Sequence, residues 1–395
     1  MDHGPDERAR APFHGLVMPR TSSRRKPSAM AVAARPLFLV LVAVSLLTGI
    51  AGGLLRVGVM LPSTANTAWL GQAGLQHAAL MICGFLGTVI GLERAVAVKL
   101  PAAFVAPLAS SLGALCLLLG QTTHGAWLGV AAAAVFTAVN VVVVRRQWAG
   151  HTLLLLAAAA AWLAGSLLFA LGQGAEATLP WWFAFLVMTI AAERLEMTRL
   201  MRRRPAAPVL LVAVLAVMVL GCVASAVSVQ VGGVLYGVSL VALALWLGTF
   251  DIARRTVFAQ GLSRYMAVCL LTGYIWLAIA GAAWAATALG FPLRDVALHA
   301  LGLGFIFSMI MGHGPVILPA IARVKLQFGG FFYVPLLALH LSLALRLGWG
   351  AIEPEQRAIG AISNGLSIAL FAATVVGAAI AWKIRYGADG ARKTS

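Results

Sequence analysis

Four histidines lie inside long apolar stretches of the chain: His77, His299, His313 and His340. An imidazole in a hydrocarbon environment has two polar nitrogens that need partners, and ionisable groups at such depth usually mark a functional site. Imidazole is also the commonest metal ligand in proteins and an axial ligand of haem b. We therefore expect these four residues to be metal or cofactor ligands, or else neutral histidines hydrogen-bonded to a neighbouring helix. The other four are expected to be solvated: His3, His14, His124 and His151.

Three of these histidines are expected at one level of the membrane. At ~1.5 Å of rise per residue, His77 lies roughly 8 Å, His299 about 6 Å and His340 about 10 Å below the same surface. Three imidazoles from three helices at one depth are what a metal or haem site requires. Met81 lies one turn after His77 on the same helical face, where its thioether is a candidate copper ligand or a simple gap-filling side chain.

His313 follows His299 by about 21 Å along the same helix, on nearly the same face. The two therefore cannot bind one ion. Pro315 and Pro319, which follow in "GHGPVILP", each remove a backbone donor and free a carbonyl. His313 is expected either to bond those carbonyls or to be a separate metal ligand.

The composition is that of a polytopic helical membrane protein. Of the 395 residues, 61% are hydrophobic and 10% charged, and the mean hydropathy is +0.94. The apolar residues occur in repeated runs long enough to cross a bilayer. The four cysteines form no CxxC pair and no CxxCH motif for covalent haem attachment, so we interpret them as small buried hydrophobic residues. They are Cys83, Cys116, Cys222 and Cys269.

The apolar runs predict an all-α fold with twelve transmembrane helices in residues 35–385. Residues 1–34, which are polar and basic, are predicted to be a disordered cytoplasmic tail, and residues 386–395 a short cytoplasmic C-terminal tail. Met18 and Met30 are alternative starts to Met1. The expected spans are 36–58, 72–97, 101–120, 125–144, 151–172, 179–200, 206–228, 231–253, 264–289, 295–322, 331–347 and 360–382.

The net charge of +17 is explained by topology. With both termini in the cytoplasm, all but four of the 29 Lys and Arg residues fall on the cytoplasmic side. This partition follows the positive-inside rule, supports the count of twelve, and predicts a multi-pass protein of a bacterial inner membrane, with the lipid bilayer as its partner. No nucleic-acid partner is expected. The four exceptions are Arg56, Arg294, Arg346 and Arg357.

An internal repeat is suggested by two short matches. The second expected helix ends in "GLERAVAVK" and the sixth in "AAERLEMTR", so Glu93–Arg94 and Glu193–Arg194 occupy matching ends. Three parallel four-helix units would place helices two, six and ten in equivalent positions. The alternative is that such pairs are common at a helix end beside a basic loop.

Two segments resemble the NnrS family of bacterial membrane proteins. "HAALMICGFLGTVIG", from His77, resembles the HxxxMxxGF segment of that family, and "HALGLGFIFSM", from His299, resembles its HALxxGxxxxM segment. The "GHG" around His313 is similar to its GHTG. The resemblance implies an inner-membrane protein that contains haem b and copper and is linked to nitric oxide, denitrification or the nitrosative stress response. It also implies distant kinship to haem–copper oxidases, whose twelve helices form three pseudo-repeats with ligands on helices two and ten.

The chain departs from these relatives in two ways. The stretch between His299 and the GHG carries no arginine, so Arg56 and Arg294 are our candidates for partners of the haem propionates. Residues 179–228 contain no histidine, although the resemblance would require further histidine ligands there for dioxygen or nitric oxide reduction. We therefore expect a redox-linked protein that binds a small gaseous or nitrogen-oxide ligand, without being an oxidase or reductase; its electron-transfer partner is left open.

Two other classes of protein stay open. A proton-coupled secondary transporter of the twelve-helix type would use acidic residues near the inner helix ends, although snorkelling ion pairs explain these as well. An assembly factor that handles haem or copper without turnover would carry the same ligands. The acidic residues are Glu93, Glu193, Glu196 and Asp251.

Overall fold

The computed structural model describes residues 29–60, 68–197, 206–322 and 324–392. Within these ranges the chain is helical, and 12 helices are long and apolar enough to cross a membrane, which confirms the predicted fold class and count. The longer elements are α1 (Ala29–Arg56), α4 (Thr88–Val98), α5 (Val105–Leu118), α6 (Thr122–Arg146), α7 (Gly150–Ala170), α8 (Ala175–Met197), α9 (Ala206–Ala224), α10 (Val229–Phe250), α12 (Gly261–Ala288), α14 (Ser308–Ala322), α15 (Tyr333–Leu347) and α16 (Pro354–Arg392).

Shorter pieces complete several of the spans. The second span runs through α3 and a π-helix into α4, and the tenth runs through α13 and a second π-helix into α14. The short elements are α2 (Ala68–Leu75), α3 (His77–Ala79), π-helix η1 (Leu80–Gly87), η2 (Pro101–Phe104), α11 (Ala253–Thr256), α13 (Arg294–His299), π-helix η4 (Ala300–Phe307), η5 (Gly330–Phe332) and η6 (Trp349–Ala351).

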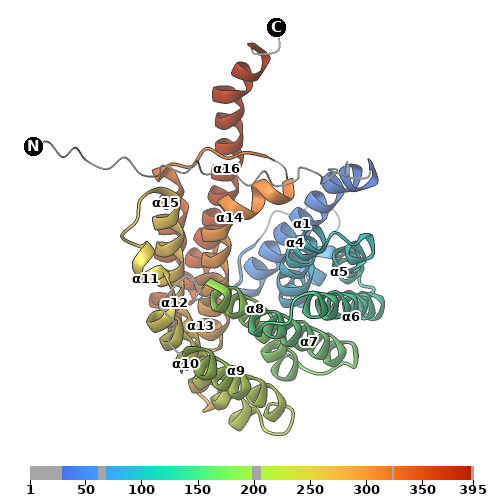
Figure 1. Ribbon diagram of the computed structural model, residues 1–395. Helices are drawn as coiled ribbons and strands as arrows, with labels where there is room; N and C mark the ends of the chain where they lie inside the picture. The colour runs from blue at the N-terminus through green and yellow to red at the C-terminus, as the bar shows by residue number, and fades with distance from the viewer. Residues whose placement is uncertain (1–28, 61–67, 198–205, 323, 393–395) are drawn as a thin grey trace, which may run out of the picture.

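The two predicted tails differ from the structure at their inner borders. α1 begins at Ala29, so residues 29–34 of the predicted tail are helical; the run "AMAVAA" has high helix propensity. Residues 1–28 lie outside the described part of the chain. At the other terminus α16 continues to Arg392, past the predicted border at residue 385. Its C-terminal end projects beyond the rest of the bundle (Figure 1).

Consecutive helices pack side by side, so that the chain winds around the bundle (Figure 1). α4 to α7 occupy one side and α12 to α16 the other, with α8 in contact with both η1 and α10. We name the two ends of the bundle after buried arginines. α13 begins and α15 ends at the Arg346 end, whereas α4 and α8 end at the Arg194 end.

Small residues allow some of the helices to approach closely. A Cβ on Gly237 of α10 would lie 2.5 Å from the carbonyl oxygen of Gly281 in α12, and a Cβ on Gly281 would lie 2.5 Å from that of Gly237. Real Cβ atoms do not approach so closely, so both positions require glycine for the backbones to touch, as is common between transmembrane helices. Larger side chains fill the interior elsewhere: the rings of Trp162 and Phe185 stack with centroids 4.8 Å apart.

Candidate histidine-pair site

His77 and His299 come together across two helices that are distant in sequence. Their ring centroids are 6.4 Å apart, and the ring planes are 26° from parallel. Both side chains line one cavity near the Arg346 end. The expected convergence of these two residues is therefore present in the structure.

A π-helix follows each of these histidines. η1 starts three residues after His77, and η4 starts directly after His299; both elements are 8 residues long. π-helical turns are rare and occur frequently at functional sites. Their presence in the second and tenth spans, which carry the histidine pair, adds a structural likeness to the repeat suggested by the sequence.

His77 is oriented by two glycines of α1. The Nδ1 atom of His77 lies 2.7 Å from the carbonyl oxygen of Gly49, to which a protonated Nδ1 donates. A Cβ on Gly53 would lie 2.9 Å from Cε1 of His77, so the absence of a side chain there makes room for the ring. This tautomer leaves the Nε2 lone pair of His77 available to a ligand.

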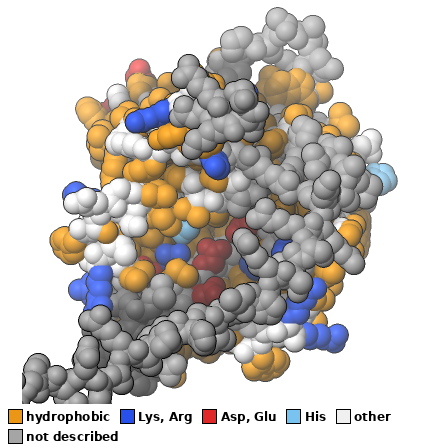
Figure 2. All heavy atoms as spheres, turned by 45° about the horizontal axis from the view of Figure 1, so that its top comes forward, with side chains coloured by type: hydrophobic (Ala, Val, Ile, Leu, Met, Phe, Trp, Pro, Cys, Tyr) orange, Lys and Arg blue, Asp and Glu red, His pale blue; other side chains and the backbone are white. Residues whose placement is uncertain are grey.

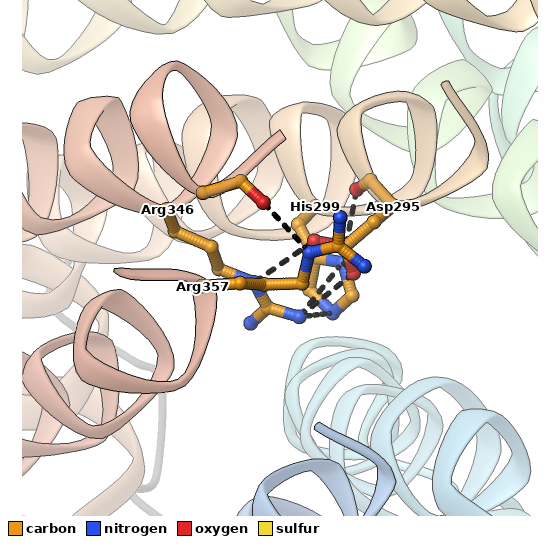
Figure 3. Close-up of polar contacts among 5 residues, drawn as sticks. Asp295, His299, Arg346 and Arg357 are labelled. Atoms are coloured by element: carbon orange, nitrogen blue, oxygen red, sulfur yellow. Dashed lines mark hydrogen bonds and ion pairs between the residues drawn. The ribbon is translucent and has the colours of Figure 1, made fainter. Parts of the chain in front are cut away.

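His299 is oriented by a carboxylate one helical turn earlier. Its Nδ1 atom lies 2.9 Å from Oδ1 of Asp295 and 3.0 Å from the Asp295 carbonyl oxygen. Arg346 donates to both carboxylate oxygens of Asp295, from Nε at 3.1 Å and from one terminal nitrogen at 2.9 Å (Figure 3). That nitrogen of Arg346 also lies 3.1 Å from Nε2 of His299. A carboxylate behind a histidine fixes the tautomer and raises the basicity of the other nitrogen.

Arg346 is buried because α16 packs tightly against α15 at this level. Only 6% of the residue is exposed, and a Cβ on Gly360 of α16 would lie 2.6 Å from the Cβ of Arg346. Arg357, one turn before Gly360, donates from Nε to the carbonyl oxygen of Gly350 at 2.8 Å and so ties the start of α16 to the preceding turn (Figure 3).

The cavity beside the histidine pair is largely apolar. Its empty volume is about 960 Å³, which includes its open mouth, and its walls come from α1, the second span, α8, the tenth span, α15 and α16. Apolar side chains such as Phe85, Phe183 and Phe307 dominate the lining. Its polar lining groups are the two histidines, Arg346 and Asn364. Apolar cavities with few convergent polar groups are the usual form of cofactor and small-molecule sites.

The other predicted ligands occupy different surroundings. Met81 lines the cavity beside His77, and its sulfur lies against Gly49, where a Cβ would be 2.6 Å away. His340 is absent from the cavity wall; its Nδ1 accepts a hydrogen bond from Nε1 of Trp276 at 2.9 Å. The structure thus brings Met81, but not His340, to the histidine pair.

His313 lies toward the Arg194 end, and both of its ring nitrogens have partners. Nδ1 is 2.7 Å from the carbonyl oxygen of Met309, and Nε2 accepts from Arg194 at 3.1 Å. The partner carbonyl is that of Met309, one turn before His313, whereas the expectation pointed to the carbonyls that Pro315 and Pro319 leave free.

The arginines predicted as propionate partners lie at the same end as the pair but outside the cavity wall. Arg56 is exposed and donates to the carbonyl oxygen of Gly74 at 3.3 Å, and Arg294 pairs with Glu176. Arg346 is the arginine that lines the cavity. Asp295 and Arg346 are the residues of this candidate site that the sequence did not single out as ligands or partners. The four-residue spacing of Asp295 and His299 was a usable signal, whereas the role of Arg346 depends on tertiary packing.

Buried charge is concentrated at the Arg194 end. Asp251 is fully buried, and its Oδ2 lies 4.0 Å from Nε of Arg194, while its Oδ1 accepts from the Ala253 amide at 2.7 Å. Burial raises the pKa of the Asp251 carboxyl, although Arg194 and the Ala253 amide act in the opposite direction. Asp251 is therefore not the snorkelling group that the sequence suggested.

Further titratable groups lie at the same end. Glu93 and Glu193 are near enough to repel each other, and Arg94 lies beside both. Figure 2 shows acidic side chains gathered in a hollow, with Lys and Arg side chains around it. His151, expected to be solvated, is only 6% exposed and lies 3.8 Å from the Glu196 carboxylate. His124 is exposed, as expected.

The described residues contain no metal site of the usual multi-residue kind. No group of three or more His, Cys, Asp or Glu residues there is arranged to hold an ion. All four cysteines are free; Cys222 and Cys269 are buried as predicted, and Cys83 and Cys116 are partly exposed. A metal at the histidine pair would therefore need ligands other than these residue types, such as the Met81 thioether or a cofactor.

Comparison with known proteins places the chain in a family without assigning it an activity. Searches among curated proteins and among solved structures find no match. A family model described as "Domain of unknown function (DUF8744)" matches residues 35–380, which include every residue of the histidine-pair site. The chain therefore belongs to the DUF8744 family.

Proposed function

We propose that this protein binds haem b in the cavity at the Arg346 end, where His77 and His299 would hold its iron. The observation that carries the proposal is the 6.4 Å separation of the two ring centroids in the wall of one cavity. Metal–imidazole bonds are ~2 Å long, so two rings bound to one ion from opposite sides have centroids roughly 6 Å apart. The distance suits an ion between the rings.

The donor set favours haem over a bare ion. A porphyrin supplies four nitrogen ligands, so the protein needs to add only two, whereas a bare ion needs three or four protein ligands. The described residues provide the pair and no third ligand of the usual kinds. The apolar walls of the cavity are also suited to a macrocycle. Copper binding by His77 and Met81 stays a prediction that ranks below haem binding.

The surroundings assign a task to each residue of this site. The Gly49 carbonyl and the Asp295 carboxylate hold the Nδ1 protons of His77 and His299, so that both Nε2 atoms are available for the iron. For His299 to bind the iron, its Nε2 atom would have to lose its contact with Arg346. Arg346 would still keep its two hydrogen bonds to Asp295. As the arginine in the cavity wall, Arg346 is suited to attract a haem carboxylate.

The proposed setting is the bacterial inner membrane, with both termini and the Arg194 end in the cytoplasm. The distribution of Lys and Arg supports this orientation. The haem, when bound, would supply reversible one-electron chemistry or a binding place for a small nitrogen oxide. The link to nitric oxide and nitrosative stress rests on the resemblance to the NnrS family. Because the sixth and seventh spans lack histidine, we do not propose catalytic oxygen or nitric oxide reduction.

The test is the absorption spectrum of the full chain purified from haem-replete cells. We expect a Soret band with the reduced bands of a six-coordinate haem, lost in His77→Ala and in His299→Ala. His340→Ala is the matched control, because this histidine lies in a span but not in the cavity wall, and it should retain the band. A colourless wild-type protein that also fails to bind added haemin would contradict the proposal.

A proton-coupled transporter is the second candidate, and one observation favours it. Asp251 is a fully buried carboxylate beside Arg194, and buried acidic groups in membrane proteins serve as proton relays in pumps and transporters. Proton-coupled uptake of a solute by proteoliposomes, abolished in Asp251→Asn but retained in His77→Ala, would favour this class over haem binding. A haem or copper assembly factor would show the Soret band or bound metal without any turnover.

A further inference from the structure

A second cavity lies on the other side of η1 from the histidine pair. It has an empty volume of about 320 Å³, including its mouth, and is bounded by η1, α5, α6, α7 and α8. Ala79, Cys83 and Gly84 face it, whereas Met81, Ile82 and Phe85 face the histidine cavity. The small residues that line most of it leave room for one small molecule.

Two buried polar side chains on its wall have no hydrogen-bond partner. Ser166 is 2% exposed and Trp182 is 3% exposed, and neither Oγ of Ser166 nor Nε1 of Trp182 is satisfied. A Cβ on Gly165 would lie 3.0 Å from Nε1 of Trp182, so the indole N–H edge lies against α7 next to Ser166. Buried polar groups without partners are rare and costly in native proteins.

Several comparable residues elsewhere in the described chain have hydrogen-bond partners. Ser111 and Ser225 donate to the carbonyl four residues earlier in their own helices, at 2.9 Å in both cases. Nε1 of Trp246 donates to the Ala207 carbonyl at 2.8 Å. Ser166 is a helical serine in the same situation as the first two, but its hydroxyl makes no such bond. Some other buried polar atoms, such as Oγ1 of Thr88 and Nε1 of Trp162, also lack a partner, but Ser166 and Trp182 are the two of this kind that line this cavity together.

The chemistry of the wall defines the class of ligand. We propose that this cavity binds a small uncharged molecule that carries a hydrogen-bond acceptor, held by the indole N–H of Trp182 and the hydroxyl of Ser166. The indole is a donor only, so its partner must accept. No charged side chain lines the cavity, which disfavours an ion. The volume limits the molecule to a few heavy atoms.

Cys83 provides a reporter within the same wall. The test measures its modification by methyl methanethiosulfonate in the intact wild-type chain, with each cysteine followed by peptide mass spectrometry. Acetonitrile, which has a nitrile acceptor, is compared with propyne, which has the same shape and no such acceptor. Acetonitrile at twice its dissociation constant should slow labelling of Cys83 about threefold by occupancy, and propyne should have a smaller effect.

Variants link the protection to the two donors. Ser166→Ala and Trp182→Phe should each remove the protection by acetonitrile, and Ser166→Ala keeps the test decisive should the tryptophan variant fail to fold. Ser239→Ala is the matched control, because its Oγ already donates to the Tyr236 carbonyl at 2.6 Å, outside the cavity. Equal protection by propyne, unchanged protection in Ser166→Ala, or no protection at all, as for a cavity that holds only water, would overturn the proposal. None of these outcomes depends on haem.

Discussion

His299 and His313 lie on one membrane span, yet the two ends of the bundle use them differently. At the Arg346 end, His299 faces a cavity and another imidazole, and a carboxylate holds its Nδ1. At the Arg194 end, His313 accepts from Arg194 and is bonded to the Met309 carbonyl, so neither nitrogen is available. Depth in the membrane therefore identifies histidines that are candidate ligands. Which of these histidines can bind a ligand depends on the hydrogen-bond partners of its two ring nitrogens.

The largest expected effect is the loss of stability when the buried pair at the Arg194 end is broken. Arg194→Leu would leave Asp251 fully buried without its cationic neighbour, and breaking one partner of a buried ion pair typically costs about 3–5 kcal/mol. We expect a marked fall in the unfolding temperature measured in detergent, while protein that remains folded keeps its Soret band. Arg254→Leu is the control, because that arginine is exposed. Equal stability of the Arg194 and Arg254 variants would show that the buried pair is not structural.

The next largest expected effect is weaker haem binding when the carboxylate behind His299 at the Arg346 end is neutralised. Asp295→Asn preserves the shape of the side chain but removes the charge behind His299, and loss of such a partner typically weakens binding about 10–100-fold. Titration of haemin into the apoprotein should show the loss, and the midpoint potential should become more positive, because a less basic imidazole stabilises ferric iron less. Glu355→Gln, at an exposed position in the first turn of α16, should leave both values unchanged.

The sequence predicts the membrane-spanning helices, but it predicts only part of the candidate site. Hydropathy and the distribution of arginines determine the spans, because a bilayer demands long apolar helices. Equal depth on separate spans pointed to the meeting of His77 and His299, but it pointed equally to His340, which lies against Trp276 instead. The π-helices were not predictable, since apolar stretches such as Leu80–Gly87 are equally compatible with an α-helix. The role of Arg346 and the bond from Arg194 to His313 depend on how distant helices pack, which no local pattern reports.

A smaller expected effect tests whether the packing of His77 against α1 contributes to haem binding. In Gly53→Ala the new Cβ would lie 2.9 Å from Cε1 of His77, so the ring or α1 must shift. Overpacking of this kind typically costs about 1–3 kcal/mol, and we expect most of it as weaker haem binding. Gly71→Ala meets no atom within 4 Å and should bind haemin as the wild type does. Unaltered binding in Gly53→Ala would mean that His77 is not held against α1.

A pH dependence separates the two ends without a large structural change. Because burial raises the folded-state pKa of Asp251 above its usual value, the carboxyl contributes stability below about pH 4 that is lost as the pH rises through the folded-state pKa. The unfolding temperature of the wild type should therefore fall as the pH rises above about 4. The unfolding temperature of Asp251→Asn should depend less on pH. An identical pH profile in the two proteins would exclude Asp251 as the titrating group.

The smallest effect concerns His340, which resembles a ligand in sequence but not in its contacts. His340→Phe would remove the acceptor of the Trp276 N–H; because this donor is only partly buried, the loss should lie at the lower end of the about 1–3 kcal/mol that an unsatisfied buried donor costs. His340→Gln retains an acceptor and should recover part of that stability, while both variants keep the Soret band of the wild type. Loss of the band in His340→Gln would make this histidine a ligand after all, because a purely structural residue acts through stability alone. The same criterion, a lost spectrum against a lowered unfolding temperature, then applies to every imidazole in the bundle.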